Sequence, residues 1–329
     1  MPKPRVIGID HGNANIKTRH YVFPAGYAEC GHLPTLGKQD VLSYEGKDYV
    51  LVSKRMTQRN DKTICEGHFI LSLFAIGMEL MHNGMDFMAD KNERGAVEVV
   101  LAVGLPPEYF KEGAVKFANY LKRSNQPEQT ERTKQIGFKL NSIGFRVEII
   151  DVFVFPQAYA AALTKSDELS EFHLVNVVDA GGFTVDCLRL ENFNVDMRIL
   201  KSLPHGMDIL FSRINDKVRA KMQKEIPDST IEGILLQDPK TLTHTSQERI
   251  NLVLDEAKAF TQDMLLAISR TQLDLMEDTT LFIGGGAILL KRLIEESGLV
   301  KKPIFTESVH ANAIGYEMIY ADRKGGGGR

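Results

Sequence analysis

Cysteine is scarce in this sequence of 329 residues, and tryptophan is absent. Cys30, Cys65 and Cys187 are odd in number and far apart, so they indicate neither a disulfide framework nor a zinc cluster. We expect three free thiols that are buried or half-buried. The pattern argues against a small secreted domain held together by disulfides.

Long hydrophobic runs are missing too. The longest candidate, Phe69 to Met81, is interrupted by Ser72 and Glu79, and nothing approaches the roughly 18 apolar residues of a membrane span. The first residues, Met-Pro-Lys-Pro-Arg, lead into a strand-like segment without a secretory signal. We therefore expect a cytoplasmic protein without a membrane partner.

An excess of one charge is the third absence. Lys and Arg number 40 against 43 Asp and Glu, which gives a net charge of −3. This balance argues against a protein that coats nucleic acid by bulk charge, although it leaves room for a local basic patch. With 43% hydrophobic and 25% charged residues, the chain has an ordinary globular composition, and its length suggests about two domains.

One pattern occurs twice. The segments 6–12 and 176–182 are apolar strands that end in Asp10-His11-Gly12 and Asp179-Ala180-Gly181-Gly182, and a β-rich strand follows each. A single Asp-x-Gly turn is ordinary hairpin chemistry. Its recurrence at the start of two α/β halves predicts two related domains that face one another.

Hydrophobic periodicity predicts an alternation of strands and helices along both halves. We expect strands over 6–10, 16–23, 41–44, 49–52, 97–103, 133–140, 145–150, 152–155, 174–179, 183–190, 195–200 and 280–283. We expect helices over 67–82, 108–122, 157–163, 207–224, 246–275 and 287–296, and a last one from about 311 to before 324. The expected domains are 1–165, completed by the helix at about 306–324, and 166–305, with a flexible glycine-rich tail over 325–329.

Glycine at a hairpin tip lets backbone N–H groups approach an anion. Gly12 with Asn13, Ala14 and Asn15 is suited to one phosphate, and Gly181 and Gly182 with Phe183 to another. The two Asp residues before these turns are suited to hold hydrated Mg²⁺.

Lys17, in the strand that returns from the first turn, is placed to reach the phosphates. Taken alone, it is better explained as a solvated lysine at a strand edge.

A third glycine segment, Gly284-Gly285-Gly286-Ala287, lies between an apolar strand and a helix. Such a turn presents free N–H groups and the positive end of a helix to a ligand. A tight strand-to-helix connection is the alternative. The segment is neither a P-loop nor the complete dinucleotide fingerprint, since GxxxxGK[ST] is absent and the third glycine of GxGxxG is missing.

Five motifs in this order resemble the actin-like ATPase superfamily, which includes actin, heat-shock chaperone ATPases and sugar kinases. They are the two Asp-x-Gly loops, the glycine segment after Ile283, and two connecting segments, Phe155-Pro156-Gln157-Ala158-Tyr159-Ala160 and Ala311-Asn312-Ala313-Ile314-Gly315-Tyr316. The resemblance implies an α/β fold of two related, ribonuclease H-like domains that flank a nucleotide cleft.

The first loop, Asp-x-Gly-x-x-Asn-x-Lys, and the compact length resemble the bacterial plasmid-segregation actins, the ParM-like group. The resemblance implies filaments that hydrolyse ATP on assembly, with GTP not distinguished, and that segregate plasmid DNA. It also implies Mg²⁺, self-association and an adaptor that binds a plasmid centromere, so that DNA is contacted only indirectly. A non-filamentous kinase or nucleotide-switch ATPase of the same fold is the alternative.

The resemblance also implies roles for residues. Asp10 and Asp179 would organise the water shell of the metal, Lys17 would balance phosphate charge, and Gln157 would orient the attacking water. The ParM-like group more often has Glu at the position of Gln157, and Gln can orient a water but cannot accept its proton. Gln157 would otherwise be only the first residue of a helix after Pro156.

Two further positions remain open. Alternation along its strand directs Asp186 either at the cleft or at solvent. Of the residues where relatives contact ribose and base, Gly206, Asp208, Arg213 and Lys217, we include only Lys217 among the candidate nucleotide ligands. Asp208 is as well explained by a favourable charge at a helix start.

Overall fold

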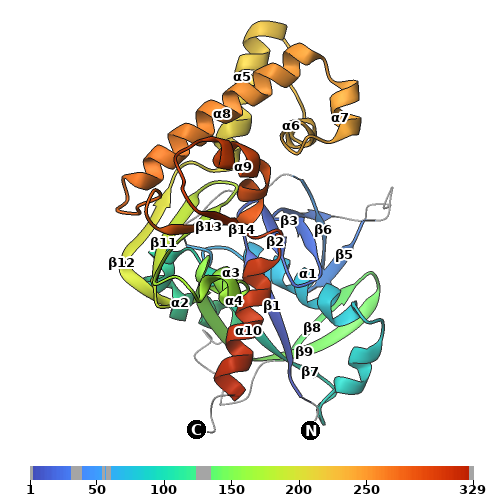
Figure 1. Ribbon diagram of the computed structural model, residues 1–329. Helices are drawn as coiled ribbons and strands as arrows, with labels where there is room; N and C mark the ends of the chain where they lie inside the picture. Colours follow the sequence, from blue (N-terminus) through green and yellow to red (C-terminus); the bar gives the residue numbers. More distant parts are fainter. Residues whose placement is uncertain (1–2, 31–38, 54–55, 57–60, 124–134, 326–329) are drawn as a thin grey trace. The chain divides into compact units, whose positions relative to one another are not determined.

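The computed structural model describes residues 3–30, 39–53, 56, 61–123 and 135–325. The chain forms two units, one of residues 1–164 with 310–329 and one of residues 165–309 (Figure 1). Each unit contains a mixed β-sheet with helices packed against it. In the described part of the chain, none of the helices combines the length and apolar character that a membrane crossing requires.

The sheet of the first unit has the strand order β3-β2-β1-β7-β9-β8-β5-β6-β4. Its strands are β1 (Arg5–His11), β2 (Asn15–Lys17), β3 (Val22–Pro24), β4 (Tyr27–Cys30), β5 (Val41–Tyr44), β6 (Lys47–Leu51), β7 (Val97–Leu105), β8 (Gln135–Leu140) and β9 (Ile143–Pro156). Strands β1, β7 and β9 are parallel neighbours. Their carboxyl ends therefore meet at one edge of the sheet, where ligands of open α/β sheets usually bind.

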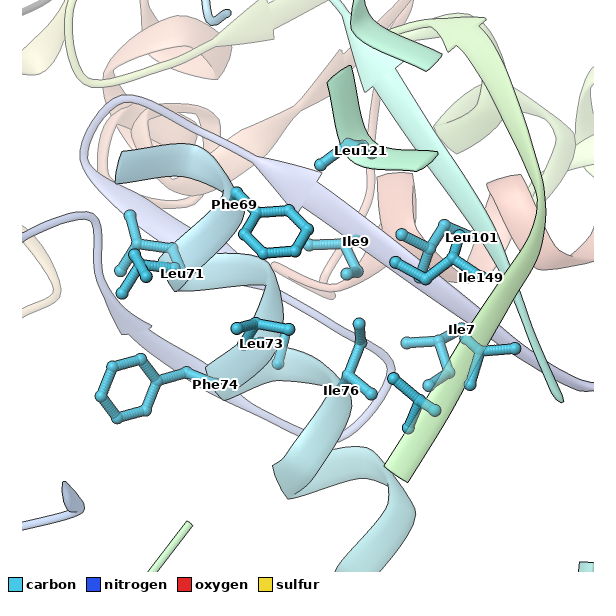
Figure 2. Close-up of a cluster of buried hydrophobic side chains, with 14 of the residues drawn as sticks. Ile7, Ile9, Phe69, Leu71, Leu73, Phe74, Ile76, Leu101, Leu121 and Ile149 are labelled. Atoms are coloured by element: carbon cyan, nitrogen blue, oxygen red, sulfur yellow. The ribbon is translucent and has the colours of Figure 1, made fainter. Parts of the chain in front are cut away.

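The helices of the first unit cover the centre of its sheet. They are α1 (Gly67–Met81), α2 (Pro107–Lys122), α3 (Tyr159–Leu163) and α10 (Ala311–Gly325), with a 3-10 turn η1 (Asp86–Asp90). Helix α1 is apolar over most of its surface and is buried on nearly all sides. Figure 2 shows Phe69 and Ile76 of α1 on the side of Ile9 and Ile7 of β1, while Phe74 lies on the other side of the helix. A helix of this kind belongs to the core of a large domain.

Small residues let α10 approach β1 and α3 closely. A Cβ atom added at Gly8 of β1 would lie 2.1 Å from the carbonyl oxygen of Ala313. One added at Gly315 of α10 would lie 1.9 Å from the carbonyl oxygen of Ala160 in α3. Glycine is required at both positions because the backbones occupy the space of a side chain.

The second unit is built around the sheet β12-β11-β10-β13-β14. Its strands are β10 (Leu174–Ala180), β11 (Val185–Glu191), β12 (Asn194–Leu203), β13 (Thr279–Ile283) and β14 (Pro303–Phe305). Its helices are α4 (Ser166–Leu169), α5 (Met207–Met222), α6 (Asp228–Leu235), α7 (Pro239–His244), α8 (Gln247–Ser269) and α9 (Gly284–Glu296). Helices α5 and α8 pack against one another (Figure 1), and a continuous apolar core lies among these elements.

Several expected boundaries differ from the observed ones. The strands expected over 145–150 and 152–155 form one strand, β9, whose register shifts opposite Val99 and Val100. A bulge of this kind bends a strand without ending it. Helices α6 and α7 fall in a segment for which no helix was expected, and α8 ends at Ser269 and not near Leu275. Among the thiols, Cys65 is exposed, contrary to expectation.

Candidate functional site

Asp10 lies near the carboxyl end of β1 and is almost completely buried, with 3% of its surface exposed. Its Oδ1 atom accepts a hydrogen bond of 2.9 Å from Nε2 of Gln157. Its Oδ2 atom lies 3.7 Å from Nζ of Lys17 and accepts a bond of 3.5 Å from Nδ2 of Asn312. A buried carboxylate needs such partners. The first unit therefore brings three candidate residues, Asp10, Lys17 and Gln157, into contact.

Lys17 is opposite Asp10 because β1 and β2 are antiparallel and pair these two residues directly. Its side chain is 17% exposed, so the ammonium group is neither deeply buried nor a freely solvated charge at a strand edge. The strand pairing therefore holds the ammonium group of Lys17 beside the carboxylate of Asp10.

Gln157 does not lie on the helix where it was expected. Helix α3 begins at Tyr159, and Gln157 lies in a turn between β9 and this helix. The N–H of Tyr159 donates to the carbonyl of Gln157 (2.8 Å), and Ala158 between them has φ +69° and ψ −46°. This is the rare, strained form of the γ-turn. The N–H of Ala158 donates to Oδ1 of Asn312 (3.0 Å), which holds the turn in place.

The first glycine loop is a tight connection between β1 and β2. A Cβ atom at Gly12 would lie 2.7 Å from the carbonyl oxygen of Asn15, so no larger residue fits this turn unchanged. The carbonyl of Ala14 accepts a hydrogen bond of 3.0 Å from the N–H of Ala25. Gly12, Asn13 and Ala14 are half-buried, and they begin two residues after Asp10 along the chain.

The second glycine loop connects β10 and β11 and is fixed by the start of α5. The carbonyls of Gly181, Gly182 and Phe183 accept hydrogen bonds from the N–H groups of Met207 (3.1 Å), Asp208 (2.9 Å) and Gly206 (3.2 Å). The C=O and N–H of a trans peptide point in opposite directions. The N–H groups that follow these carbonyls, those of residues 182–184, are therefore directed away from α5.

Asp179 precedes this loop and lies against the third glycine segment. A Cβ atom at Gly284 would lie 2.4 Å from Oδ1 of Asp179, and Gly284 has φ +87°. Glycine is required here both for space and for backbone conformation. The second unit thus brings Asp179, the loop after it and Gly284 together.

The glycines at 284–286 were expected to form a turn before a helix, but they form the first turn of α9 itself. The N–H groups of a first helical turn have no partner within the helix, and they attract anions. Ala287 was also expected to contact the ligand, but its side chain is buried in the core of the second unit. The glycines remain suited to a ligand, whereas the side chain of Ala287 serves packing.

Lys217 of α5 contacts the buried carboxylate of Glu256 in α8, and Arg213 lies 3.9 Å from the same carboxylate. Arg213 also donates to Asp263 (2.9 Å). The side chain of Lys217 is 56% exposed, so its ammonium group is accessible as well as paired.

Asp186 is not directed at solvent, one of the two directions that were expected. Only 6% of its surface is exposed, and Oδ1 accepts a hydrogen bond of 2.5 Å from Oγ of Ser202 on β12. Ser202 lies directly opposite Asp186 in the antiparallel ladder.

Sequence reasoning missed Asn312 and Glu256 as site residues. Asn312 stands in a motif that was recognised, but its contact with Asp10 joins residues 302 positions apart. Glu256 lies within a regular amphipathic helix, where a glutamate carries no signal of its own.

Comparisons with known proteins identify the fold of the chain. No protein-family model and no curated protein matches the sequence. Among solved structures, the native archaeal actin homologue Ta0583 is 18% identical, with a TM-score of 0.73 over 97% of this chain and 99% of that one. The structure of Ta0583 in complex with ADP has a TM-score of 0.70, with 18% identity and the same coverage.

A 15-stranded ParM filament from Clostridium botulinum is 15% identical, with a TM-score of 0.70 over 97% of this chain and 100% of that one. The likeness extends over nearly the whole chain in each case. The fold class implied by the resemblance of the five motifs is confirmed: the chain has the fold of the actin-like ATPases, which it shares with the ParM filament proteins.

Proposed function

We propose that the protein is an actin-like ATPase that binds ATP with Mg²⁺, assembles into filaments and hydrolyses ATP on assembly. One observation carries the proposal: in each unit a strand delivers an Asp directly before a glycine hairpin, Asp10 before Gly12 and Asp179 before Gly181. The ADP complex of Ta0583 and the ParM filament from Clostridium botulinum support it.

The backbone of both loops fits a polyphosphate. Added Cβ atoms would lie 2.7 Å from a carbonyl oxygen at Gly12 and 3.0 Å from one at Gly181, so a side chain would clash in the first hairpin and fit tightly in the second. The start of α5 turns the carbonyls of the second loop to one side, which leaves its N–H groups for an anion. Gly284, Gly285 and Gly286 add the N–H groups of a helix start.

In this proposal, Asp10 and Asp179 hold Mg²⁺ through water molecules, and the metal ion supplies positive charge to neutralise the phosphates. Lys17 adds a further positive charge near Asp10. Gln157 uses its N–H to bind Asp10, so its Oε1 atom is left to accept a hydrogen bond from the attacking water. An amide orients water without taking its proton, which suffices because phosphoryl transfer depends mainly on positioning and charge.

On the second unit, Lys217 is the proposed contact to the nucleoside. Its pairing with Glu256 fixes the ammonium group on α5, while its exposure keeps it available to a ligand. The strand-to-helix glycines 284–286 are proposed to face the same nucleotide.

We propose self-association as the main interaction, and plasmid segregation as the role. The net charge of −3 gives no bulk attraction to DNA, so the proposal places a centromere-binding adaptor between filament and plasmid.

Phosphate release from ATP with Mg²⁺ tests the enzymatic part. Asp179→Ala should abolish release while the circular dichroism spectrum stays that of the wild type. Asp255→Ala, an exposed position on α8, is the matched control and should hydrolyse ATP normally. Normal phosphate release by folded Asp179→Ala protein, or none by the wild type, would contradict the proposal.

A further inference from the structure

The peptide between His11 and Gly12 in the first loop is held from behind by a lysine side chain. Nζ of Lys62 donates a hydrogen bond of 2.5 Å to the carbonyl oxygen of His11. Lys62 is 5% exposed, which is rare for a lysine. Its ammonium group therefore lies inside the first unit, next to Gly12.

Lys62 orients a peptide of the first loop as the start of α5 orients the peptides of the second loop. A carbonyl that is fixed on one side directs the N–H of its own peptide to the other side. At the second loop the donors are backbone N–H groups of residues 206–208. At the first loop the donor is the ammonium group of Lys62, and the directed group is the N–H of Gly12.

The His11 side chain is anchored as well. Its Nε2 atom lies 2.7 Å from Oγ of Ser72, and that hydroxyl donates its proton to the carbonyl of His68 (2.7 Å). Nε2 of His11 must therefore carry the proton of this hydrogen bond. Burial lowers the pKa of His68 to about 3. The ammonium group of Lys62 is the positive charge that contacts the loop.

The segment that carries Lys62 is itself fixed. Asp61 contacts Lys116 of α2 and accepts hydrogen bonds from the N–H (2.9 Å) and Oγ1 (2.6 Å) of Thr63. Phe117 of α2 packs edge-on against the His11 ring, with centroids 5.3 Å apart. Lys62 and Phe117 also line one pocket of about 260 Å³ on the first unit. Helix α2 thus supports both Lys62 and His11.

We infer that Lys62 is a positioning residue of the first phosphate loop. By fixing the His11 carbonyl, it presents the N–H of Gly12 to the phosphates, and it adds positive charge behind the loop. The charge acts strongly because the ammonium group is buried and bonds directly to the loop. The inference rests on the proposed function, since it requires that the loop binds phosphate.

Affinities for ADP and for adenosine separate phosphate binding from nucleoside binding. Isothermal titration gives the affinity for ADP with Mg²⁺, and competition against ADP gives that for adenosine. In Lys62→Met protein we expect about tenfold weaker ADP binding, because one charged hydrogen bond is lost. Adenosine binding should stay within about twofold of the wild type. Lys111→Met is the matched control, since Lys111 is an exposed lysine on the same helix, α2; its ratio of affinities should be that of the wild type.

The outcomes distinguish the two proposals. If the wild type binds ADP no more tightly than adenosine, the proposed function fails and the inference with it. If the wild type prefers ADP and Lys62→Met keeps the same preference, only the inference is overturned. If Lys62→Met does not fold, Lys62→Gln replaces it, because the amide is uncharged and one bond shorter, so that both the charge and the contact with the His11 carbonyl are lost; an unchanged ratio in that variant would also overturn the inference.

Discussion

Gly315→Ala tests the packing that holds the first half of the site together. Gly315 lies in α10, where alanine would ordinarily stabilise a helix by about 1 kcal/mol. The new methyl group would lie 1.9 Å from the carbonyl oxygen and 2.3 Å from the carbonyl carbon of Ala160, so α3 and α10 must separate. Overpacking of this kind costs about 1–3 kcal/mol, and more when the obstacle is backbone. We therefore expect a net loss of about 2 kcal/mol in the free energy of unfolding.

Urea unfolding followed by circular dichroism measures this loss. The matched control is Gly137→Ala in β8, because a Cβ atom there meets nothing within 4 Å, and it should be neutral or stabilising by up to about 1 kcal/mol. Gly315→Ala protein should also hydrolyse ATP more slowly than the wild type, since α10 carries Asn312, which bonds both Asp10 and the turn of Gln157. Gly315→Ala protein as stable as the wild type would refute the reasoning.

Two other variants probe the buried imidazole and the second loop. The pKa of His68 is lowered to about 3 by burial, so below pH 6.5 the unfolded chain binds a proton that the folded one does not, and stability is lost as the pH falls. From pH 7 to pH 5 this loss of stability is about 2 kcal/mol. His68→Phe should remove the loss in urea titrations at the two pH values. An equal loss in the wild type and the variant would contradict the lowered pKa of His68. Gly206→Ala places a methyl group 2.2 Å from the carbonyl carbon of Phe183, and it should lower ATP affinity at least tenfold in a folded protein; wild-type affinity by titration would count against the role of this loop.

Much of the fold was predictable because its signals are local. An apolar strand followed by Asp-x-Gly dictates a buried strand and a tight turn, and β1 and β10 both follow this rule. The pairing of Asp10 with Lys17 follows from the short hairpin that joins β1 and β2. The contact between Asp179 and Gly284 required only that β10 and β13 be neighbours.

Other parts depend on contacts across long sequence separations. Asn312 reaches Asp10 only because glycines at 8 and 315 let α10 lie close to β1 and α3. Gln157 lies in a strained γ-turn at Ala158, and alanine gives no sign of a positive φ. Lys62 stands in a polar segment that resembles any solvated loop, and its burial becomes visible only when α2 is packed beside it.

Sedimentation tests the central proposal most directly. The wild-type protein is incubated with ATP and Mg²⁺, with ADP and Mg²⁺, or without nucleotide, and the pellets are examined by electron microscopy. We predict that filaments sediment with ATP, that far less protein sediments with ADP or without nucleotide, and that phosphate release accompanies assembly. Protein that stays in the supernatant under all three conditions across a range of salt concentrations would contradict the filament proposal.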